Sequence, residues 1–462
     1  MSSMKPDRRG FLKRSAALAG LAVGAIPFAS RKAFASVTPG LVLGQADTKL
    51  NVTPDEPTID DLLYGGRSSY EKTISIHSIN SPEGLRTLTP LQDSIGIITP
   101  SGLHYLVQGD KHIPNINPAE HSLIIHGMVD RPTVFTMDDI KRLPSVSEVH
   151  WIECTGNSGL QWYKALLQNK KAGRTDGSVI QGVHGRLSCS EWTGVRLSTL
   201  LNLVGVKKGA SWVIAEAGDS IHHAKSIPLA KAGDDTMLAY GQNGEALRRE
   251  QGYPLRLHTP GFQGVCNVKF LRSLKVTDEP YYMQREISAY TNTKPNGMSS
   301  WYESQQGPRS LITFPSDAHK LSGAGTYEIS GIAWCGRGKI ARVEITADAG
   351  KTWKDASLQQ PIFSKAWTRF RMPWDWNGTE TVIGSRTTNE YGEIQSTVEG
   401  LAKLWGDDFN PPIPAADVLH WWETAPISSF LNNPIQLWKV KPDGSVFDAT
   451  YVKYLPNPYY PS

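Results

Sequence analysis

The apolar residues of this chain fall in short runs separated by glycine and proline. Because such runs are too short for long helices, we expect a fold built mainly on short strands. The 462 residues include 42 Gly and 30 Pro. Between about residues 90 and 291 the apolar runs are 122–128, 212–215, 255–259 and 270–276. Helical patterns at 137–140 and 196–204 interrupt these runs. Short runs bounded by turn residues predict strands, so we expect an α+β domain here.

A different pattern begins near residue 309 and continues to about residue 397. Its β-branched and aromatic segments are 326–334, 340–346, 368–374 and 381–389, with turn residues between them. Short strands at this spacing predict a β-sandwich. Beyond Glu399 the chain is rich in Trp, Pro and Asn, and we expect an irregular segment there. Its aromatic residues between 404 and 429 either cover the core or form a partner surface.

The first 35 residues have the pattern of an export leader. Arg8 and Arg9 open a basic start, an apolar stretch covers 16–29, and Ala33-Phe34-Ala35 is a small-x-small cleavage site. Paired arginines predict the twin-arginine route, which carries folded and often cofactor-loaded proteins. The apolar stretch is short for a membrane of roughly 30 Å, and no longer one follows, so we expect no transmembrane segment in the mature chain. The expected location is the periplasm.

The net charge of +4 does not indicate a nucleic-acid partner. Seven Lys and Arg residues and one Asp fall in the first 35 residues, a net +6, so removing the leader changes +4 to −2. The basic balance of the whole chain therefore belongs to the leader, and no nucleic-acid partner is expected.

The four cysteines are too far apart to form the usual metal or haem motifs. Cys154, Cys189, Cys266 and Cys335 include no CxxC and no CxxCH spacing. This spacing argues against structural zinc, the common iron–sulfur clusters and covalently bound haem. Whether Cys189, Cys266 and Cys335 form a disulfide stays open at this point.

Cys154 has the most informative surroundings of the four. A strand-like run at 149–152 ends in small polar residues at 153–159, where a large ligand can approach closely. A thiolate there suits a redox metal. The competing hypothesis is a cysteine hydrolase that uses His150, His184 or His222 as its base.

Several blocks between His112 and Tyr290 keep the order and spacing of a known family. They are 191–197 (EWTGVRL), 225–229 (KSIPL), 238–245 (LAYGQNGE), 251–256 (QGYPLR), 260–261 (PG) and 267–271 (NVKFL). Together with 343–353 (VEITADAGKTW), they resemble the sulfite oxidase family of molybdopterin enzymes. The resemblance implies an α+β molybdopterin-binding domain followed by an immunoglobulin-like β-sandwich dimerisation domain. The expected bounds are a signal peptide at 1–35, an arm at 36–89, these two domains at 90–305 and 306–425, and a tail at 426–462.

Three further segments resemble the sulfane dehydrogenase branch of that family, the molybdenum subunits of periplasmic thiosulfate oxidation. They are 153–159 (ECTGNSG), 222–228 (HHAKSIP) and 433–440 (NPIQLWKV) with 443–446 (DGSV).

The resemblance implies roles for seven residues. Cys154 would be the protein thiolate on molybdenum, and Arg256 and Lys269 would hold the pterin phosphate. Tyr290 stands near the active-site tyrosine of the family. Asp219, Gln251 and Asn267 would contact the pterin, with Gln251 at a position where the family has a histidine.

Besides Gln251, three further positions depart from the sulfite oxidase pattern. A family arginine is replaced in the segment 107–110 (VQGD), and Ser158 and Gly159 stand where two more arginines are common. Fewer fixed cations near the metal should weaken the capture of a small free dianion. We therefore expect a substrate sulfur held on the cysteine of a carrier protein.

The implied reaction is oxygen-atom transfer that oxidises carrier-bound sulfane sulfur, or sulfite, toward sulfate. Because the chain has no haem motif, its electrons would leave to a c-type cytochrome subunit, and we expect a homodimer or a higher assembly with that cytochrome. Within the family, the alternatives are a plain sulfite dehydrogenase or a sulfoxide reductase. Outside it, they are a Cys154 hydrolase or a periplasmic binding or scaffold protein without the cofactor.

Overall fold

The structure, a computed structural model, describes residues 59–68, 70–77, 85–109, 112–159, 163–164, 166–167, 178–293, 299–301, 305–407, 411–424 and 434–450. The expected leader and most of the expected arm lie outside the described residues. The chain divides into two compact units, residues 1–67 and 68–462. The first contributes one described helix, α2 (Ile59–Tyr64). None of the described helices combines the length and apolar character needed to cross a membrane.

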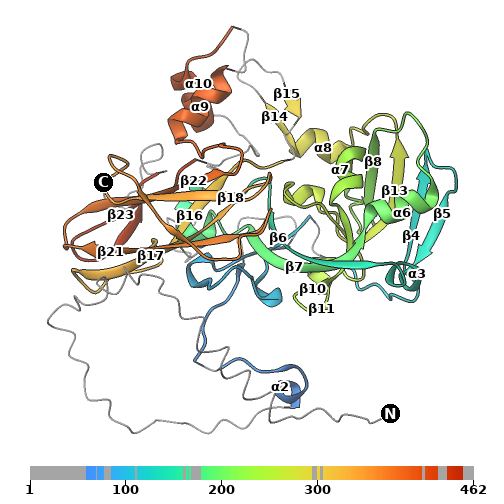
Figure 1. The fold of residues 1–462 in the computed structure, drawn as a ribbon, viewed down its shortest axis with the longest axis horizontal. Coiled ribbons are helices and arrows are strands. Elements are labelled where there is room, and N and C mark those ends of the chain that lie inside the picture. Colours follow the sequence, from blue (N-terminus) through green and yellow to red (C-terminus); the bar gives the residue numbers. More distant parts are fainter. Residues whose placement is uncertain are drawn as a thin grey trace, which may run out of the picture. The chain divides into compact units, whose positions relative to one another are not determined.

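Five antiparallel strands form a first large sheet, most of which can be followed in Figure 1. They are β6 (Ser145–Glu153), β7 (Leu187–Arg196), β10 (Met237–Gln242), β11 (Glu245–Ala246) and β12 (Arg256–His258). Their order is β11-β10-β7-β6, with β12 also paired to β10. β6 pairs with β7 over its full length, from Ser145 opposite Val195 to Glu153 opposite Leu187. Cys154 therefore follows directly after a fully paired strand.

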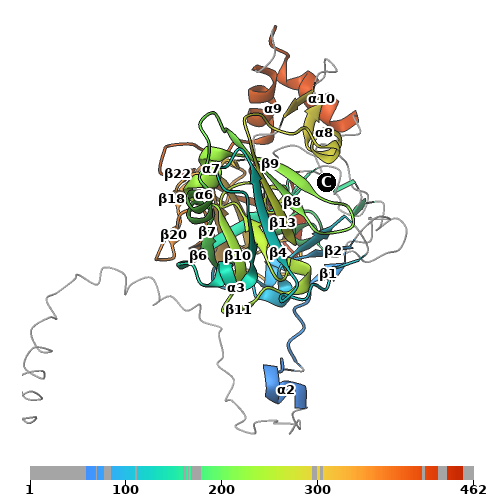
Figure 2. The same ribbon diagram turned by 90° about the vertical axis from the view of Figure 1, so that its right-hand side faces the viewer.

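A second sheet of five strands has the order β5-β4-β13-β8-β9 (Figure 2). Its strands are β4 (Ser122–Gly127), β5 (Thr133–Thr136), β8 (Trp212–Ala217), β9 (Ala224–Pro228) and β13 (Leu271–Thr277). β13 is parallel to β4, and the other neighbours are antiparallel. The strands predicted at 122–128, 212–215 and 270–276 are confirmed.

Three short helices accompany this sheet: α3 (Met137–Lys141), α6 (Leu197–Val204) and α7 (Leu229–Asp234). α3 begins at a capping box formed by Thr136 and Asp139. α6 buries four apolar residues at helical spacing, namely Leu197, Leu200, Leu201 and Val204. The helices predicted at 137–140 and 196–204 are thus confirmed.

A smaller antiparallel sheet precedes these elements and contributes to the site described below. It consists of β1 (Ile76–His77), β2 (Leu85–Leu88) and β3 (Leu106–Gln108). In this sheet Arg86 lies opposite Val107.

Two further sheets form the predicted β-sandwich. One has the order β16-β17-β21-β20, and the other has the order β19-β18-β22-β23-β24. The bounds are β16 (Arg309–Phe314), β17 (Gly325–Trp334), β18 (Ile340–Thr346), β19 (Lys354–Asp355), β20 (Ser357–Leu358), β21 (Thr368–Trp376), β22 (Thr381–Asn389), β23 (Leu437–Val440) and β24 (Val446–Asp448). The runs predicted at 340–346 and 381–389 coincide with β18 and β22.

The segment beyond Glu399 differs from the irregular wrap that we predicted. It forms α9 (Val398–Asp407) and α10 (Ala415–Thr424), and β23 then pairs with β22 inside the sandwich sheet. Trp405 packs against the buried cluster of the sandwich, as a residue that covers the core would. The side chains of Trp421 and Trp422 lie outside the described ones.

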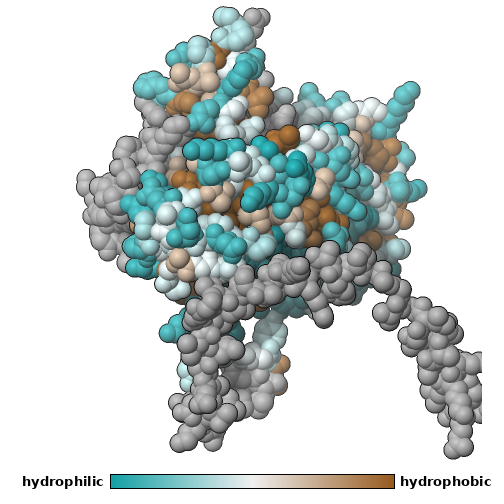
Figure 3. Space-filling view, turned by 60° about the vertical axis from the view of Figure 1, so that its left-hand side comes forward, coloured by the Kyte–Doolittle hydropathy of each residue, from teal (hydrophilic) through white to brown (hydrophobic). Residues whose placement is uncertain are grey.

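In Figure 3, exposed apolar side chains form small patches among hydrophilic ones.

The remaining described elements are short connectors. They are α5 (Val179–Gly182), α8 (Gln284–Ala289), β14 (Thr291–Thr293), β15 (Ser299–Trp301) and the 3₁₀ helices η1 (Leu91–Asp93), η2 (Ser101–Leu103), η3 (Arg249–Gln251) and η4 (Gly264–Cys266).

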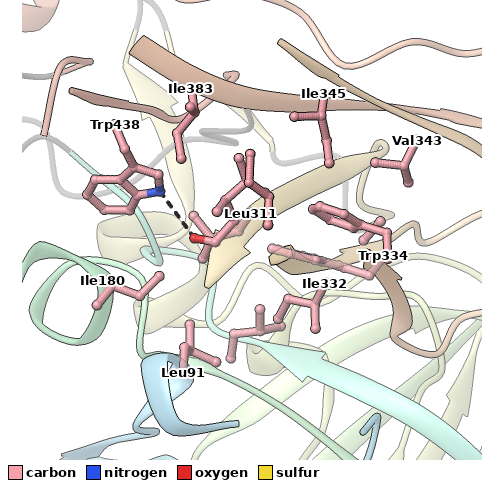
Figure 4. Packing of buried hydrophobic residues seen from close by; sticks show 14 of the residues in the cluster. Leu91, Ile180, Leu311, Ile332, Trp334, Val343, Ile345, Ile383 and Trp438 are labelled. Carbon is pink, nitrogen blue, oxygen red and sulfur yellow. Dashed lines mark hydrogen bonds between the residues drawn. The ribbon is translucent and has the colours of Figure 1, made fainter. Parts of the chain in front are cut away.

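One hydrophobic core joins the sandwich to the chain that precedes it (Figure 4). Leu91 and Ile180 from the first half belong to the same buried cluster as Trp334 and Trp438 from the sandwich. The indole Nε1 of Trp438 donates to the Ile312 carbonyl at 3.1 Å, so this large side chain is fixed in orientation as well as buried.

A buried carboxylate ties the end of β6 to the sandwich. The side chain of Glu153 is fully buried and forms an ion pair with Arg309 on β16. It also accepts from the Trp334 indole at 2.8 Å and from the Asn157 amide at 2.9 Å. Arg309 in turn donates to the Ser158 hydroxyl at 2.5 Å. The loop after β6 is therefore held by two strands of the sandwich.

Replacing Arg309 with Met should lower the free energy of unfolding by about 3–5 kcal/mol, because the Glu153 carboxylate would stay buried without its cation. Urea denaturation measures this loss. Arg386→Met is the control, since the Arg386 side chain is 32% exposed and its partner Glu344 also lies near Arg342. The control should lose about 1 kcal/mol or less. If both variants lost the same free energy of unfolding, the ion pair between Glu153 and Arg309 would have no special stabilising role.

Candidate active site

A cavity of about 160 Å³ lies where strands from three sheets end. β2 and β3 contribute from the small sheet, β6 and β12 from the first large sheet, and β8 from the second. All seven residues singled out from the sequence line this cavity: Cys154, Asp219, Gln251, Arg256, Asn267, Lys269 and Tyr290. Residues that are distant in sequence thus meet at one site.

The loop that presents Cys154 is closed by backbone hydrogen bonds. The Cys154 amide donates to the Arg186 carbonyl at 2.9 Å, and the Asn157 amide donates to the Cys154 carbonyl at 2.9 Å. Gly264 faces this loop across the cavity wall. A Cβ atom at Gly264 would lie 2.7 Å from the Tyr105 hydroxyl and 3.2 Å from the Cα of Cys154. Only glycine lets the two loops approach so closely.

Two guanidinium groups that the sequence reasoning missed act on the Cys154 thiol. Burial raises the pKa of Cys154, while the charges of Arg186 and Arg86 act in the opposite direction. Arg86 lines the cavity from β2, and Arg186 is 1% exposed. Arg86 and Arg186 therefore place positive charge near the cysteine, although the family arginines remain absent from 107–110 and from positions 158 and 159.

Neither arginine carries a strong local signal in the sequence. Arg86 lies between Leu85 and Leu88 in a short strand, and its place is set by pairing with β3. Arg186 immediately precedes β7, whose buried residues mark it as a central strand. The one indication in the sequence is the position of Arg186 beside a buried strand, because a basic residue there needs an anionic partner or ligand.

Arg256 is a buried cation whose protein contacts leave one donor unused. Its Nη1 donates to the Gln251 carbonyl at 2.9 Å, its Nη2 donates to the Asn267 carbonyl at 3.3 Å, and it stacks on the Trp192 ring at 4.8 Å. Its Nε has no hydrogen-bond partner among the described residues. Burial lowers the pKa of Arg256 to about 10. A buried guanidinium with a spare donor is suited to an anionic ligand.

Lys269 provides the second cation on this side of the cavity. Its ammonium donates to the Val107 carbonyl at 3.2 Å and to the Glu250 carbonyl at 3.1 Å. Burial, together with the nearby charge of Arg256, lowers the pKa of Lys269 to about 7, although Asp219 acts in the opposite direction. An anion bound beside Lys269 and Arg256 would relieve this electrostatic cost.

The three polar residues predicted to contact the pterin differ in what they touch. Asp219 accepts from the Gln108 amide at 3.2 Å and from the His223 backbone amide at 3.1 Å. Gln251 donates to the Tyr105 carbonyl at 3.1 Å. Asn267 accepts from the Thr259 amide at 2.9 Å and donates to the Gln263 carbonyl at 3.1 Å. Asn267 thus shapes the loop around the cavity.

Tyr105, Tyr290 and His104 also line the cavity. Burial raises the pKa of Tyr105 well above its usual value, and the nearby Cys154 and Tyr290 also raise it. Tyr290, at the end of α8, lines the same cavity. His104 Nδ1 donates to the Tyr105 carbonyl at 3.1 Å, and its buried Nε2 has no partner among the described residues. Burial lowers the pKa of His104 to about 3, so this ring is neutral.

The histidines proposed as hydrolase bases have other partners. His184 Nδ1 lies 2.6 Å from the Ser158 hydroxyl, and its Nε2 lies 3.1 Å from Gln436. His150 Nδ1 lies 3.2 Å from His258. His222 is exposed. Among the described contacts, none joins these three histidines to the thiol of Cys154, so the hydrolase hypothesis lacks its base.

All four cysteines are free thiols in the structure. Cys189, Cys266 and Cys335 are buried, and burial raises the pKa of Cys189 to about 12. They pack as small apolar residues, whereas Cys154 faces the cavity.

Comparison with known proteins gives two domain matches. Residues 110–284 match the oxidoreductase molybdopterin binding domain, and residues 305–404 match the Mo-co oxidoreductase dimerisation domain. The solved structure of the sulfane dehydrogenase SoxCD from Paracoccus pantotrophus is 32% identical, with a TM-score of 0.74. That match covers 86% of this chain and 95% of the compared chain.

Two curated relatives match over a smaller share of their length. Mitochondrial sulfite oxidase of Drosophila melanogaster is 31% identical over 311 residues, which are 62% of this chain and 52% of that protein. NADH nitrate reductase of Ulva prolifera is 27% identical over 357 residues, which are 71% of this chain and 39% of that protein. The chain thus spans about half or less of the length of these relatives.

The pKa of about 7 for Lys269 predicts how the uptake of a phosphate-bearing cofactor depends on pH. Below pH 7 the ammonium is charged, and above pH 7 it is neutral in the cofactor-free protein. Uptake should therefore weaken roughly tenfold from pH 6 to pH 8, following the protonated fraction. Molybdenum content after reconstitution at pH 6, 7 and 8 measures this. Lys269→Arg, which stays charged, should remove the dependence; the same dependence in that variant would exclude Lys269 as its origin.

Proposed function

The chain belongs to the sulfite oxidase family of molybdopterin oxidoreductases, and from this premise we propose that it oxidises sulfur at the cavity around Cys154. The observation that carries the proposal is the cavity itself. It combines the half-buried thiol of Cys154 with the cations Arg86, Arg256 and Lys269 in its lining, and the charge of the buried Arg186 also acts on the thiol. Arg256 and Lys269 suit a cofactor phosphate, and the cations near Cys154 suit an anionic substrate.

The residues present fit a molybdenum–molybdopterin cofactor. The thiolate of Cys154 is a suitable molybdenum ligand, and Arg256 and Lys269 would hold the phosphate. Arg256 and His104 line the cavity, and each has a buried nitrogen without a partner among the described residues, Nε of Arg256 and Nε2 of His104, as expected where a polar ligand completes a site. When bound, the cofactor would supply oxygen-atom transfer coupled to a two-electron change.

The protein's own side chains would orient the substrate and control its charge. Arg86 lines the cavity near Cys154, so its guanidinium would hold the oxyanion end of a sulfur substrate. Tyr290 and Tyr105 would donate hydrogen bonds to the same oxygens, since burial keeps the pKa of Tyr105 well above its usual value and its hydroxyl protonated.

For the substrate we propose sulfane sulfur held on a carrier-protein cysteine. The support is the similarity to sulfane dehydrogenase SoxCD over nearly the full length of that chain. The absence of arginines at 158 and 159 does not by itself favour this substrate, because Arg86 and Arg186 supply positive charge near the cysteine. These cations favour a second candidate, a plain sulfite dehydrogenase acting on a free dianion.

We also propose the setting in which the enzyme works. The twin-arginine pattern supports export of the folded, cofactor-loaded chain to the periplasm. No CxxCH motif occurs in the sequence, so we propose a c-type cytochrome subunit as electron acceptor. The match to a dimerisation domain supports a homodimer, or a higher assembly that includes the cytochrome.

An assay of the purified protein with its cytochrome separates the two substrates. We expect kcat/KM to be at least about tenfold higher for a carrier protein bearing a cysteine persulfide than for free sulfite, which is a difference of about 1.4 kcal/mol in transition-state binding. Reduction of the cytochrome is the readout, and carrier protein without the persulfide is the control. A preference for sulfite would favour the plain sulfite dehydrogenase.

Cys154→Ser tests the proposed metal ligand. Turnover should fall below detection, because a hydroxyl is a much poorer ligand for a redox metal than a thiolate. The thermal midpoint should change little, because serine has nearly the same size. Cys189→Ser is the matched control, and it should keep the activity. Retained turnover in Cys154→Ser, or wild-type protein without molybdenum, would contradict the proposal and favour a scaffold or binding protein.

A further inference from the structure

The short helix that carries Tyr290 is held through a buried acid. α8 has six residues and ends at Tyr290. Among its described side chains, Gln284 and Ile287 are exposed, and Ile287 is 53% exposed. Glu286 is the exception, at 1% exposed. Apolar burial through these described side chains therefore contributes little to holding α8 in place.

The Glu286 carboxylate is met by three donors from β9. The ammonium of Lys225 lies 2.8 Å from its Oε1, and the Lys225 side chain is 2% exposed. The Ser226 amide donates to the same oxygen at 3.1 Å, and the Ser226 hydroxyl donates to Oε2 at 3.1 Å. A buried ion pair with additional hydrogen bonds fixes the position of both partners.

Ser226 also holds the segment that leads into the helix. Its one hydroxyl hydrogen is shared between Glu286 Oε2 and the Tyr281 carbonyl, which lies 2.9 Å away, and its Oγ accepts from the Tyr281 amide at 3.1 Å. Two neighbouring residues of β9 thus fix both the approach to α8 and its only described buried side chain. β9 pairs with β8, and β8 ends at Ala217, which lines the cavity.

The anchor at Glu286 is one helical turn from the cavity. The Tyr290 amide donates to the Glu286 carbonyl at 3.2 Å. Tyr290 lines the cavity and lies close enough to Tyr105 to raise the pKa of Tyr105. A displacement of Glu286 would therefore be transmitted directly to the ring of Tyr290.

We propose that Glu286 and Lys225 are positioning residues for Tyr290, which they hold in the cavity through the end of α8. This inference rests on the proposed function, in which Tyr290 faces the sulfur substrate. Neither Glu286 nor Lys225 lines the cavity, so both act through Tyr290.

A double-mutant cycle tests this coupling. Glu286→Gln should lower kcat/KM by about 10- to 100-fold, the effect of misplacing an active-site group by roughly 1 Å. In a Tyr290→Phe background, the same substitution should change kcat/KM by less than about twofold, because the hydroxyl that it misplaces is already absent. Lys225→Met should behave in the same way. An equal loss in both backgrounds would overturn the proposal, since a purely structural effect is additive.

Amide hydrogen exchange provides a readout that needs no turnover. In Glu286→Gln, exchange in residues 281–290 should accelerate while exchange in β8 stays unchanged. Acceleration throughout the protein would indicate general destabilisation and overturn the proposal. Glu344→Gln is the matched control, because Glu344 is also a buried acid in ion pairs but lies in the sandwich. That variant should keep wild-type kcat/KM within about twofold and leave exchange in 281–290 unchanged.

Ser226→Ala covers the case in which Glu286→Gln does not fold. It removes one hydroxyl and keeps the ion pair, so the same segment should open to a smaller extent. If Tyr290→Phe itself keeps wild-type kcat/KM, Tyr290 has no role to be positioned for, and the inference fails. The substrate assay and Cys154→Ser would still decide the proposed function, so the two failures are distinguishable.

Discussion

The carboxylate of Glu153 is the interaction on which the site depends most. It is fully buried, and an unpaired carboxylate at that depth would cost several kcal/mol. Its partners come from two strands of the sandwich, Arg309 on β16 and Trp334 on β17. In the folded chain, the loop that carries Cys154 is therefore held by contacts with the sandwich. The sandwich thus stabilises the loop of Cys154, although none of its described residues lines the cavity.

The same physical constraint, charge without its counter-charge, defines the cavity. Arg86, Arg256 and Lys269 line it, whereas Asp219 is the single acid among the described lining residues. Burial of this positive charge is unfavourable, as the lowered pKa values of Arg256 and Lys269 indicate. A site built in this way is preorganised for anions, because its donors need little rearrangement when an anion binds. The unfavourable free energy of placing these charges in the interior is therefore already part of the folded state before a ligand binds.

Local sequence patterns predicted many of the strands and one side of the site. The runs at 340–346 and 381–389 coincide with β18 and β22, because alternation within a strand is a local property. The strand at Leu437–Val440 was missed, since its position depends on pairing with the distant β22. Family motifs located Arg256 and Lys269, but Arg86 and Tyr105 reach the cavity through the pairing and packing of separate strands. No local pattern encodes such long-range placement.

The origin of Arg86 bears on how the charge near Cys154 can be changed. Arg86 comes from β2, and it lies outside the residues that match the molybdopterin-binding domain, which begin at residue 110. Its position opposite Val107 depends only on the register of a small sheet. Substitution at residue 86 can therefore change the charge near Cys154 without replacing a residue proposed to hold the cofactor. β3 is different, because the Val107 carbonyl accepts from Lys269 and the Gln108 amide donates to Asp219, so a change on that strand would affect both sides of the cavity.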